Sequence, residues 1–158
     1  MKWLFIIPVV LTFIIVIHFI YQGHLSQQGT AKGLIDQQLA PCPSSPNCIC
    51  TEYKDDKSHY LAPITLKSSD NTSAIEESAQ IIARMGGAVS MQTDTYLSAT
   101  FTSSLFKFID DVEVRWDQTQ QQLHIRSASR VGHHDALTNK KRVETFFSEW
   151  QKRTPLAP

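Results

Sequence analysis

The sequence has no formal net charge and lacks the motifs that bind phosphate groups. Its 158 residues contain 15 Lys and Arg and 15 Asp and Glu, so the formal net charge is zero. A protein that binds nucleic acid through phosphates needs excess positive charge, so we expect no nucleic-acid partner. There is no glycine-rich phosphate loop and no glycine-flanked serine elbow. The sequence therefore carries no motif typical of nucleotide-binding proteins or serine hydrolases.

Cysteine is also scarce, and all three cysteines lie in one stretch, PCPSSPNCIC at positions 41–50. Their spacing matches no common structural zinc site and no fourth ligand is evident nearby, so a disulfide is favoured over a soft-metal site. Outside the cytoplasm, Cys42 and Cys48 would close a short loop worth about 2 kcal/mol, and Cys50 would remain unpaired. His133 and His134 lack a third ligand, and we expect neither a metal nor a cofactor.

Charge is absent from one long apolar segment, residues 3–21, which is close to the roughly 20 residues that a membrane-spanning helix needs. A cleavable signal peptide would have a shorter apolar core followed by a small-x-small cleavage site, and none follows here. We therefore interpret residues 1–22 as an uncleaved signal anchor that contacts the lipid bilayer through residues 3–21.

The distribution of lysines indicates the orientation of this anchor. Lys2 precedes the apolar segment and the next fixed positive charge is Lys32, so the N-terminus is expected in the cytoplasm and the remaining chain outside it. Lipidation at Cys42 is disfavoured because it lies some twenty residues beyond the apolar core and follows a proline. Residues 23–39 show little periodicity and are interpreted as a linker, so the folded domain is predicted to span residues 40–153.

Hydrophobic periodicity predicts a β-α-β-β-β-β-α order in this domain. Two amphipathic helices flank strands that follow one another closely, which indicates an α+β fold whose antiparallel sheet is covered by helices on one face. The predicted strands are 59–64, 88–92, 96–102, 106–116 and 123–129, and the predicted helices are 73–85 and 138–152.

The last two strands are predicted to form a hairpin with charged residues on both faces. If Trp116 lies opposite Leu123, Asp110 lies opposite Ser129 on the apolar face, whereas a register shift of two residues would change the partners but keep the faces. On the other face, which we expect to be the outer surface, Glu113 lies opposite Arg126.

Polar residues that could carry chemistry gather around this hairpin and the turn into the last helix. They can be read as ion pairs that tie the helix to the sheet, as an anion-binding site, or as an acid–base site in which Asp110 works with Arg130. Asp110 and Asp111 are neighbours on a strand and point to opposite faces, so they cannot form a dyad. The candidate residues are Asp110, Asp111, Arg126, Ser127, Ser129, Arg130, Asp135, Asn139 and Arg142.

Several separated motifs resemble a bacterial and plastid family called domain of unknown function 1499. They are PCPSSPNC at 41–48, FIDDVEV at 108–114, RSASRVG at 126–132 and the spacing Asp135…Asn139…Arg142-Val143-Glu144. The resemblance covers residues 39–152 and supports the pairing of Cys42 with Cys48. It departs at Leu137, where the family tends to have glycine. It implies no activity, because none is established for the family.

These observations lead to one principal expectation and two alternatives. We expect a single-pass protein of the bacterial cytoplasmic (inner) membrane, with its C-terminal domain extracytoplasmic. That domain would bind an envelope component, such as an envelope protein, or a small amphipathic or anionic ligand. The alternatives are an acid–base enzyme that uses Asp110 with Arg130, and a structural subunit of a membrane complex, which would need no pocket.

Overall fold

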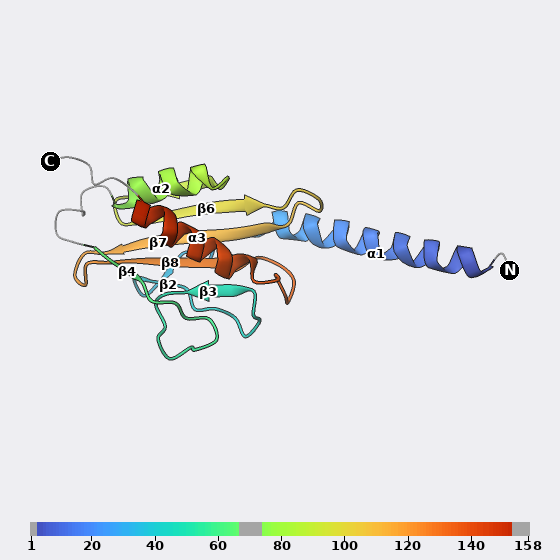
Figure 1. Ribbon diagram of the computed structural model, residues 1–158, viewed down its shortest axis with the longest axis horizontal. Coiled ribbons are helices and arrows are strands. Elements are labelled where there is room, and N and C mark those ends of the chain that lie inside the picture. The colour runs from blue at the N-terminus through green and yellow to red at the C-terminus, as the bar shows by residue number, and fades with distance from the viewer. Residues whose placement is uncertain (1–2, 67–73, 153–158) are drawn as a thin grey trace.

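A computed structural model describes residues 3–66 and 74–152, and Figure 1 shows one long helix leading into an α+β domain. The fold class predicted from the sequence is confirmed. The elements are α1 (Trp3–Gln27), β1 (Leu34–Ile35), β2 (Gln38–Leu39), β3 (Cys48–Cys50), β4 (Ile64–Thr65), α2 (Ala74–Arg84), β5 (Ala88–Gln92), β6 (Tyr96–Thr102), β7 (Ile109–Asp117), β8 (Gln122–Ser129) and α3 (Thr138–Lys152).

The main sheet has six strands in the order β3-β8-β7-β6-β5, and β4 pairs with the far end of β8. All these pairs are antiparallel. The predicted hairpin register is confirmed: Asp110 lies opposite Ser129 and Glu113 opposite Arg126. The predicted strand at 59–64 is wrong in extent, because only Ile64 of that range belongs to β4 while Tyr60 makes an isolated bridge to Cys50.

Helices α2 and α3 cover one face of the sheet, as Figure 1 shows. Apolar side chains of β7 on this face, Val114 and Trp116 among them, form one core with Ile82 of α2 and Phe146 of α3. Helix α2 ends at Arg84, and Gly86 after it has a φ of 89°, a left-handed conformation that glycine adopts without strain. Residue 73, at which this helix was predicted to begin, lies outside the described residues.

The opposite face of the sheet is not an exposed surface, so the expectation for Glu113 and Arg126 was wrong. Residues 29–42, which we call the N-terminal cover, cross it, and β2 within the cover contacts both β7 and β8. Glu113 is 0% exposed and Arg126 4% exposed. Burial is tolerated because the two charges pair with each other and because Glu113 also accepts from the Gly33 N–H of the cover.

Residues 23–39 are folded, whereas the sequence predicted a linker. Helix α1 continues through Gln27, and β1 and β2 form a hairpin. The hairpin turns at Asp36 and Gln37, which have φ of 49° and 64° as a type I′ turn requires. The prediction failed because these residues owe their order to contacts with the distant strand β7 rather than to local periodicity.

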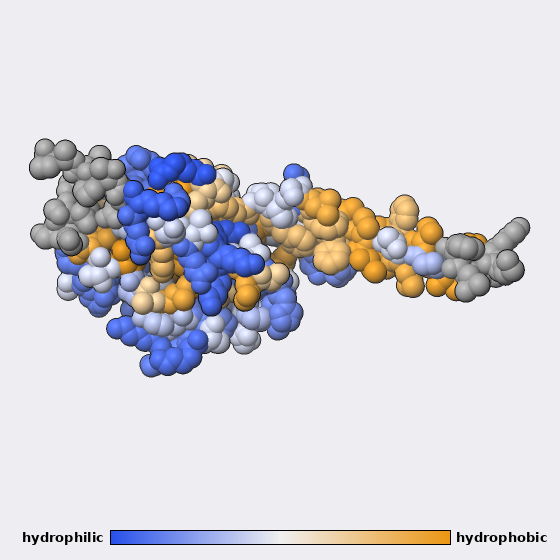
Figure 2. All heavy atoms as spheres, viewed as in Figure 1, coloured by the Kyte–Doolittle hydropathy of each residue, from blue (hydrophilic) through white to orange (hydrophobic). Residues whose placement is uncertain are grey.

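Helix α1 exposes most of its large apolar side chains, and Figure 2 shows orange surface along much of its length. Within the described residues, Ile6–Gln27 is the one helical segment long and apolar enough to cross a membrane. Its last turns contact the domain, and its remainder extends away from it (Figure 1).

Candidate functional site

A pocket of about 860 Å³ lies between the sheet and the N-terminal cover. The cover and the cysteine loop form one wall, while β8 and the residues after it form the other. The lining includes four predicted site residues: Asp111, Arg126, Ser129 and Arg130. Three cationic side chains, those of Lys32, Arg126 and Arg130, line it against the single carboxylate of Asp111.

Arg126 is the buried cation of this pocket. Its Nη1 donates to Oε2 of Glu113 at 3.0 Å, whereas its Nε is buried and has no hydrogen-bond partner among the described residues. The second oxygen of Glu113 accepts from the Tyr96 hydroxyl and from the Gly33 N–H, each at 2.7 Å. Burial, reinforced by the neighbouring Glu113 carboxylate, raises the pKa of Tyr96, so this phenol stays protonated and donates.

Arg130 forms a fixed part of the wall. Its Nη2 and Nε donate to the two oxygens of Asp111 at 2.7 and 2.9 Å, a bidentate pair. Its Nη1 donates to the backbone oxygen of Ser26 at 3.3 Å. Since every nitrogen of Arg130 is engaged, this residue shapes the pocket more than it offers donors to a ligand.

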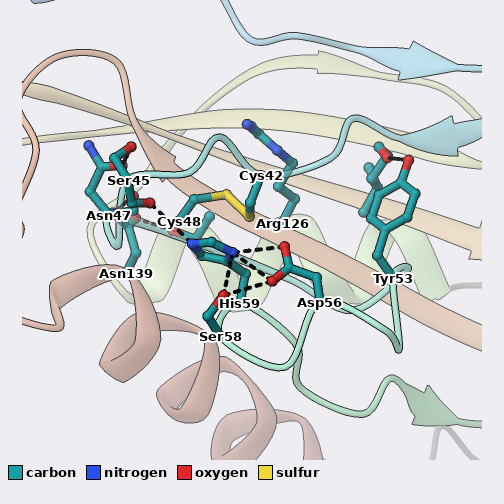
Figure 3. The surroundings of a disulfide bond; sticks show 12 residues. Cys42, Ser45, Asn47, Cys48, Tyr53, Asp56, Ser58, His59, Arg126 and Asn139 are labelled. Carbon is teal, nitrogen blue, oxygen red and sulfur yellow. Dashed lines mark hydrogen bonds and ion pairs between the residues drawn. A yellow bond between two sulfur atoms is a disulfide. The ribbon is translucent and has the colours of Figure 1, made fainter.

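The predicted disulfide between Cys42 and Cys48 is present and ties the end of the N-terminal cover to the first residue of β3. Figure 3 shows it beside Arg126, with Cys48 on β3 and Cys42 at the end of the cover. Asn47 extends this connection, since its side-chain amide donates to the backbone oxygen of Gly132 at 2.7 Å. Cys50 is unpaired and buried, and burial raises the pKa of its thiol to about 11.

The disulfide loop is also tied to the loop 51–61 through His59. In Figure 3 the ring lies between Asp56 and Ser45: Nδ1 is 2.7 Å from the Asp56 carboxylate and Nε2 is 3.2 Å from the Ser45 backbone oxygen. Hydrogen bonds from Ser58 and then His59 lower the pKa of Asp56. Ser58 donates to this carboxylate, so the three side chains form a loop clamp rather than an activated nucleophile.

The other predicted site residues form a polar corner on the helix-covered face. The Arg142 guanidinium donates to Asp110 at 2.8 Å, to Ser127 at 3.0 Å and to Asn139 at 2.6 Å. The Asn139 amide in turn donates to Asp135 and to Ser129. These bonds tie α3 to the end of the hairpin, which agrees with the structural interpretation of this cluster.

The acid–base hypothesis is not supported by this arrangement. Asp110 belongs to the polar corner and pairs with Arg142, whereas Arg130 pairs with Asp111 on the opposite face. The two proposed partners therefore cannot act on one substrate. Within residues 3–66 and 74–152, no three His, Cys, Asp or Glu side chains converge as metal ligands would.

A family model described as "protein of unknown function (DUF1499)" matches residues 38–149. The chain belongs to this family. No curated protein matches the chain. The DUF1499 match begins at residue 38, so it contains the sheet and cysteine-loop wall of the pocket, whereas Gly29, Lys32 and Ile35 of the cover precede it.

Sequence reasoning missed the contribution of the cover to this DUF1499 domain. Nothing in residues 29–33 signals that Gly33 would donate to Glu113 or that Lys32 would line a pocket. A usable signal lay in β7, where Asp111, Glu113 and Arg115 alternate with apolar residues and so put three charges on one face. Three adjacent charges in the centre of a sheet need partners from another element.

Arg115 completes this row of charges with a pair that the sequence did not predict. Its Nε and Nη2 donate to the Glu52 carboxylate at 2.7 and 3.1 Å. Glu52 also accepts from the Leu39 N–H and lies 3.4 Å from Nδ1 of His124. Burial lowers the pKa of His124, so this ring is neutral in the folded protein near pH 7.

Proposed function

We propose that this DUF1499 protein is a membrane-anchored binding protein that holds an anionic group of an envelope ligand in the pocket beneath the N-terminal cover. Helix α1 would anchor it in the bacterial cytoplasmic membrane with the domain on the extracytoplasmic side. The apolar length of α1 and the lysine distribution support this topology, and a disulfide is typical of such a compartment.

The unpartnered Nε of Arg126 is the observation that carries this proposal. Buried polar groups in folded proteins are almost always hydrogen-bonded, and a buried charge left partly unpaired costs several kcal/mol. An anionic group in the pocket would accept from this guanidinium and gain a charge-assisted hydrogen bond. Lys32, exposed at the pocket edge, adds a second positive charge, and hydroxyls of Thr30 and Ser45 line the same cavity.

The pocket also favours binding over the purely structural alternative. A subunit whose only role is assembly has no need of a cavity lined by a buried, partly unsatisfied arginine. A half-open pocket of this size with convergent polar groups is a common form of small-ligand site.

The decisive test measures ligand-dependent stability of the full-length protein in mild detergent. Glycerol 1-phosphate, citrate and inorganic phosphate are the probes, and thermal unfolding is the readout. An anion that binds the folded state at 100 times its Kd stabilises it by about 2.7 kcal/mol. Native mass spectrometry of the gently purified protein would detect a ligand carried through purification.

The matched variants are Lys32→Glu and Lys54→Glu, which reverse one exposed lysine inside and one outside the pocket. Lys32→Glu should lose the stabilisation by anions and any adduct, whereas Lys54→Glu should retain both. Equal responses of the two variants, or no response of the parent protein to any anion together with no adduct, would overturn the proposal. A reporter active only outside the cytoplasm, fused after Pro158, tests the topology separately.

A further inference from the structure

The loop between β6 and β7, residues 103–108, presents apolar side chains next to the membrane-candidate helix. Its sequence is SSLFKF, and Leu105 at its tip is 76% exposed, the highest value among the exposed large hydrophobic residues. Phe106 stacks on Phe19 of α1 with ring centroids 5.2 Å apart, and Phe108 meets the same ring edge-on at 6.3 Å. We call residues 103–108 the tip loop.

The tip loop has a fixed shape and a fixed position against α1. Within the loop, the Ser103 N–H donates to the Phe108 backbone oxygen at 2.9 Å, and the Ser103 hydroxyl accepts from the Phe108 N–H at 2.9 Å. Just after it, the fully buried Ser26 hydroxyl accepts from the Ile109 N–H at 2.8 Å and donates to the Ile109 oxygen. These bonds prevent the loop from moving independently of the helix.

Gly23 allows this close contact. A Cβ placed on Gly23 would lie 1.9 Å from the Phe106 backbone oxygen, a distance that no side chain tolerates. Glycine lowers helix stability by about 1 kcal/mol relative to alanine, so its position here is explained by the contact and not by the helix. The absence of a side chain at Gly23 therefore lets helix α1 pack directly against the backbone of the tip loop at Phe106.

The dimensions of α1 place this contact at a membrane boundary. A hydrocarbon core about 30 Å thick is crossed by about 20 helical residues, which from Trp3 reaches approximately to Gln22. Phe19 lies about 24 Å from Trp3 along the axis and so falls just inside that core. Figure 2 shows the apolar surface of α1 continuing to its junction with the domain, where the tip loop begins.

We propose that the tip loop inserts into the outer surface of the same bilayer that α1 spans, with Leu105, Phe106 and Phe108 among the acyl chains and Lys107 at the lipid phosphates. The partner is the lipid surface, because the loop continues the apolar surface of α1 at the depth where the helix would leave the membrane. The inference rests on the proposed membrane anchoring by α1, and it gives the domain a second membrane contact beside that helix.

Spin labels in proteoliposomes of phosphatidylethanolamine and phosphatidylglycerol test this directly. Single-cysteine labels are placed at Leu105, at Phe13 in the middle of α1, and at Gln120 in the β7–β8 turn, which lies at the opposite end of β7. Unsubstituted protein serves as the blank, since the Cys50 thiol is buried. The label at Leu105→Cys should lie about 5–10 Å below the headgroup boundary, with oxygen more accessible to it than a nickel chelate.

The three positions separate the possible outcomes. Lipid exposure at Phe13 and Leu105 with water exposure at Gln120 supports the inference. Lipid exposure at Phe13 alone overturns it and leaves the anchor intact, whereas water exposure at Phe13 shows that the proposed anchor itself is wrong. Gly23→Ala should move the Leu105 label out of the lipid while leaving Phe13 inside, and an unchanged depth at Leu105 in this variant would contradict the role assigned to the helix contact.

Discussion

The helix-covered face of the sheet and the face beneath the N-terminal cover exclude water by different chemistry. On the helix-covered face, β7 contributes Val112, Val114 and Trp116 to an apolar core, and polar residues are confined to one corner. On the covered face, the same strand contributes Asp111, Glu113 and Arg115, each in an ion pair.

This difference indicates that the apolar helix-covered face contributes mainly to stability, whereas the charged covered face determines which groups can pack against the sheet. Apolar burial is non-directional and tolerates small displacements. Buried ion pairs require defined partners, and the loss of either partner strongly destabilises the protein. The covered face is also the one that contains a pocket and an incompletely paired arginine. Its charges hold a short segment of chain, the N-terminal cover, in place against the sheet.

The largest expected effect comes from removing the charge of Glu113. Glu113→Gln leaves the buried Arg126 without its ion-pair partner, and we expect a loss of about 3–5 kcal/mol in the free energy of unfolding. Urea unfolding followed by circular dichroism measures it. Glu144→Gln, which alters an exposed carboxylate on α3, should change stability by less than about 0.5 kcal/mol.

The corresponding change on the helix-covered face tests whether the two faces differ. Asp110→Asn should cost only about 1–2 kcal/mol, because Arg142 keeps its bonds to Ser127 and Asn139 and its stacking on Phe101. If Asp110→Asn proved as destabilising as Glu113→Gln, the distinction between the faces would be lost.

The disulfide between Cys42 and Cys48 is expected to have an intermediate effect. Replacing both Cys42 and Cys48 with serine opens a loop with a sequence separation of 6, which should lower stability by about 2 kcal/mol. Thiol titration gives an independent check. The folded oxidised protein should react slowly, because burial raises the pKa of Cys50 to about 11, and unfolding should release one thiol. Three reactive thiols would refute the disulfide.

A smaller, pH-dependent effect should arise from His124 on the covered face. Burial lowers its pKa below the usual value near 6.5, so the unfolded chain takes up a proton before the folded one does. The contribution of neutral His124 to the free energy of unfolding is fully present above pH 6.5. It declines by up to about 1 kcal/mol as the pH falls toward the lowered pKa. Thermal unfolding at pH 7.5 and 5.5 should show this decline, and His124→Gln should reduce it. His133→Gln, at an exposed loop position, should leave the profile unchanged.

The smallest expected effect lies before α3, on the helix-covered side. Leu137 adopts a φ of 65° where the resembling family tends to have glycine, and its side chain is 58% exposed. A left-handed conformation costs a residue with a side chain about 1 kcal/mol relative to glycine. Leu137→Gly should therefore raise stability by about 0.5 kcal/mol, measured as a higher melting temperature. Leu105→Gly, at another exposed leucine without a positive φ, should give no such gain.

The sequence predicted the helix-covered face well and the covered face poorly. Alternation along 106–116 and the spacing of Val143, Phe146 and Trp150 were enough to place most of β7 and α3, because these patterns repeat within one element. Residues 106–108 were wrongly included in the strand, which begins at Ile109, and β3 was not predicted. The polar corner was also anticipated as a group. The same alternation placed Glu113 opposite Arg126 but could not indicate that a segment eighty residues earlier would bury them.

The pocket could be predicted from the sequence only in part, for the same reason. Its sheet wall lies within motifs that the family resemblance had already marked, including Arg126, Ser129 and Arg130. Its other wall comes from residues without hydrophobic periodicity, whose order depends on a few hydrogen bonds to β7. Local patterns carry no information about such bonds. The expected partnership of Asp110 with Arg130 failed because the two side chains lie on opposite faces of the sheet. Asp110 pairs with Arg142 on the helix-covered face, whereas Arg130 pairs with Asp111 on the covered face.

The hydrogen bonds of Ser26 have a consequence for how this protein can be divided. A fragment that begins at residue 38, where the family match begins, would lack Ser26, Gly33 and the whole pocket wall before that point. It would expose Glu113 and Arg126 to water and leave the Ile109 backbone without its partner. The shortest self-sufficient piece of this chain is therefore longer than the stretch that identifies its family, and it reaches back into the last turns of the apolar helix.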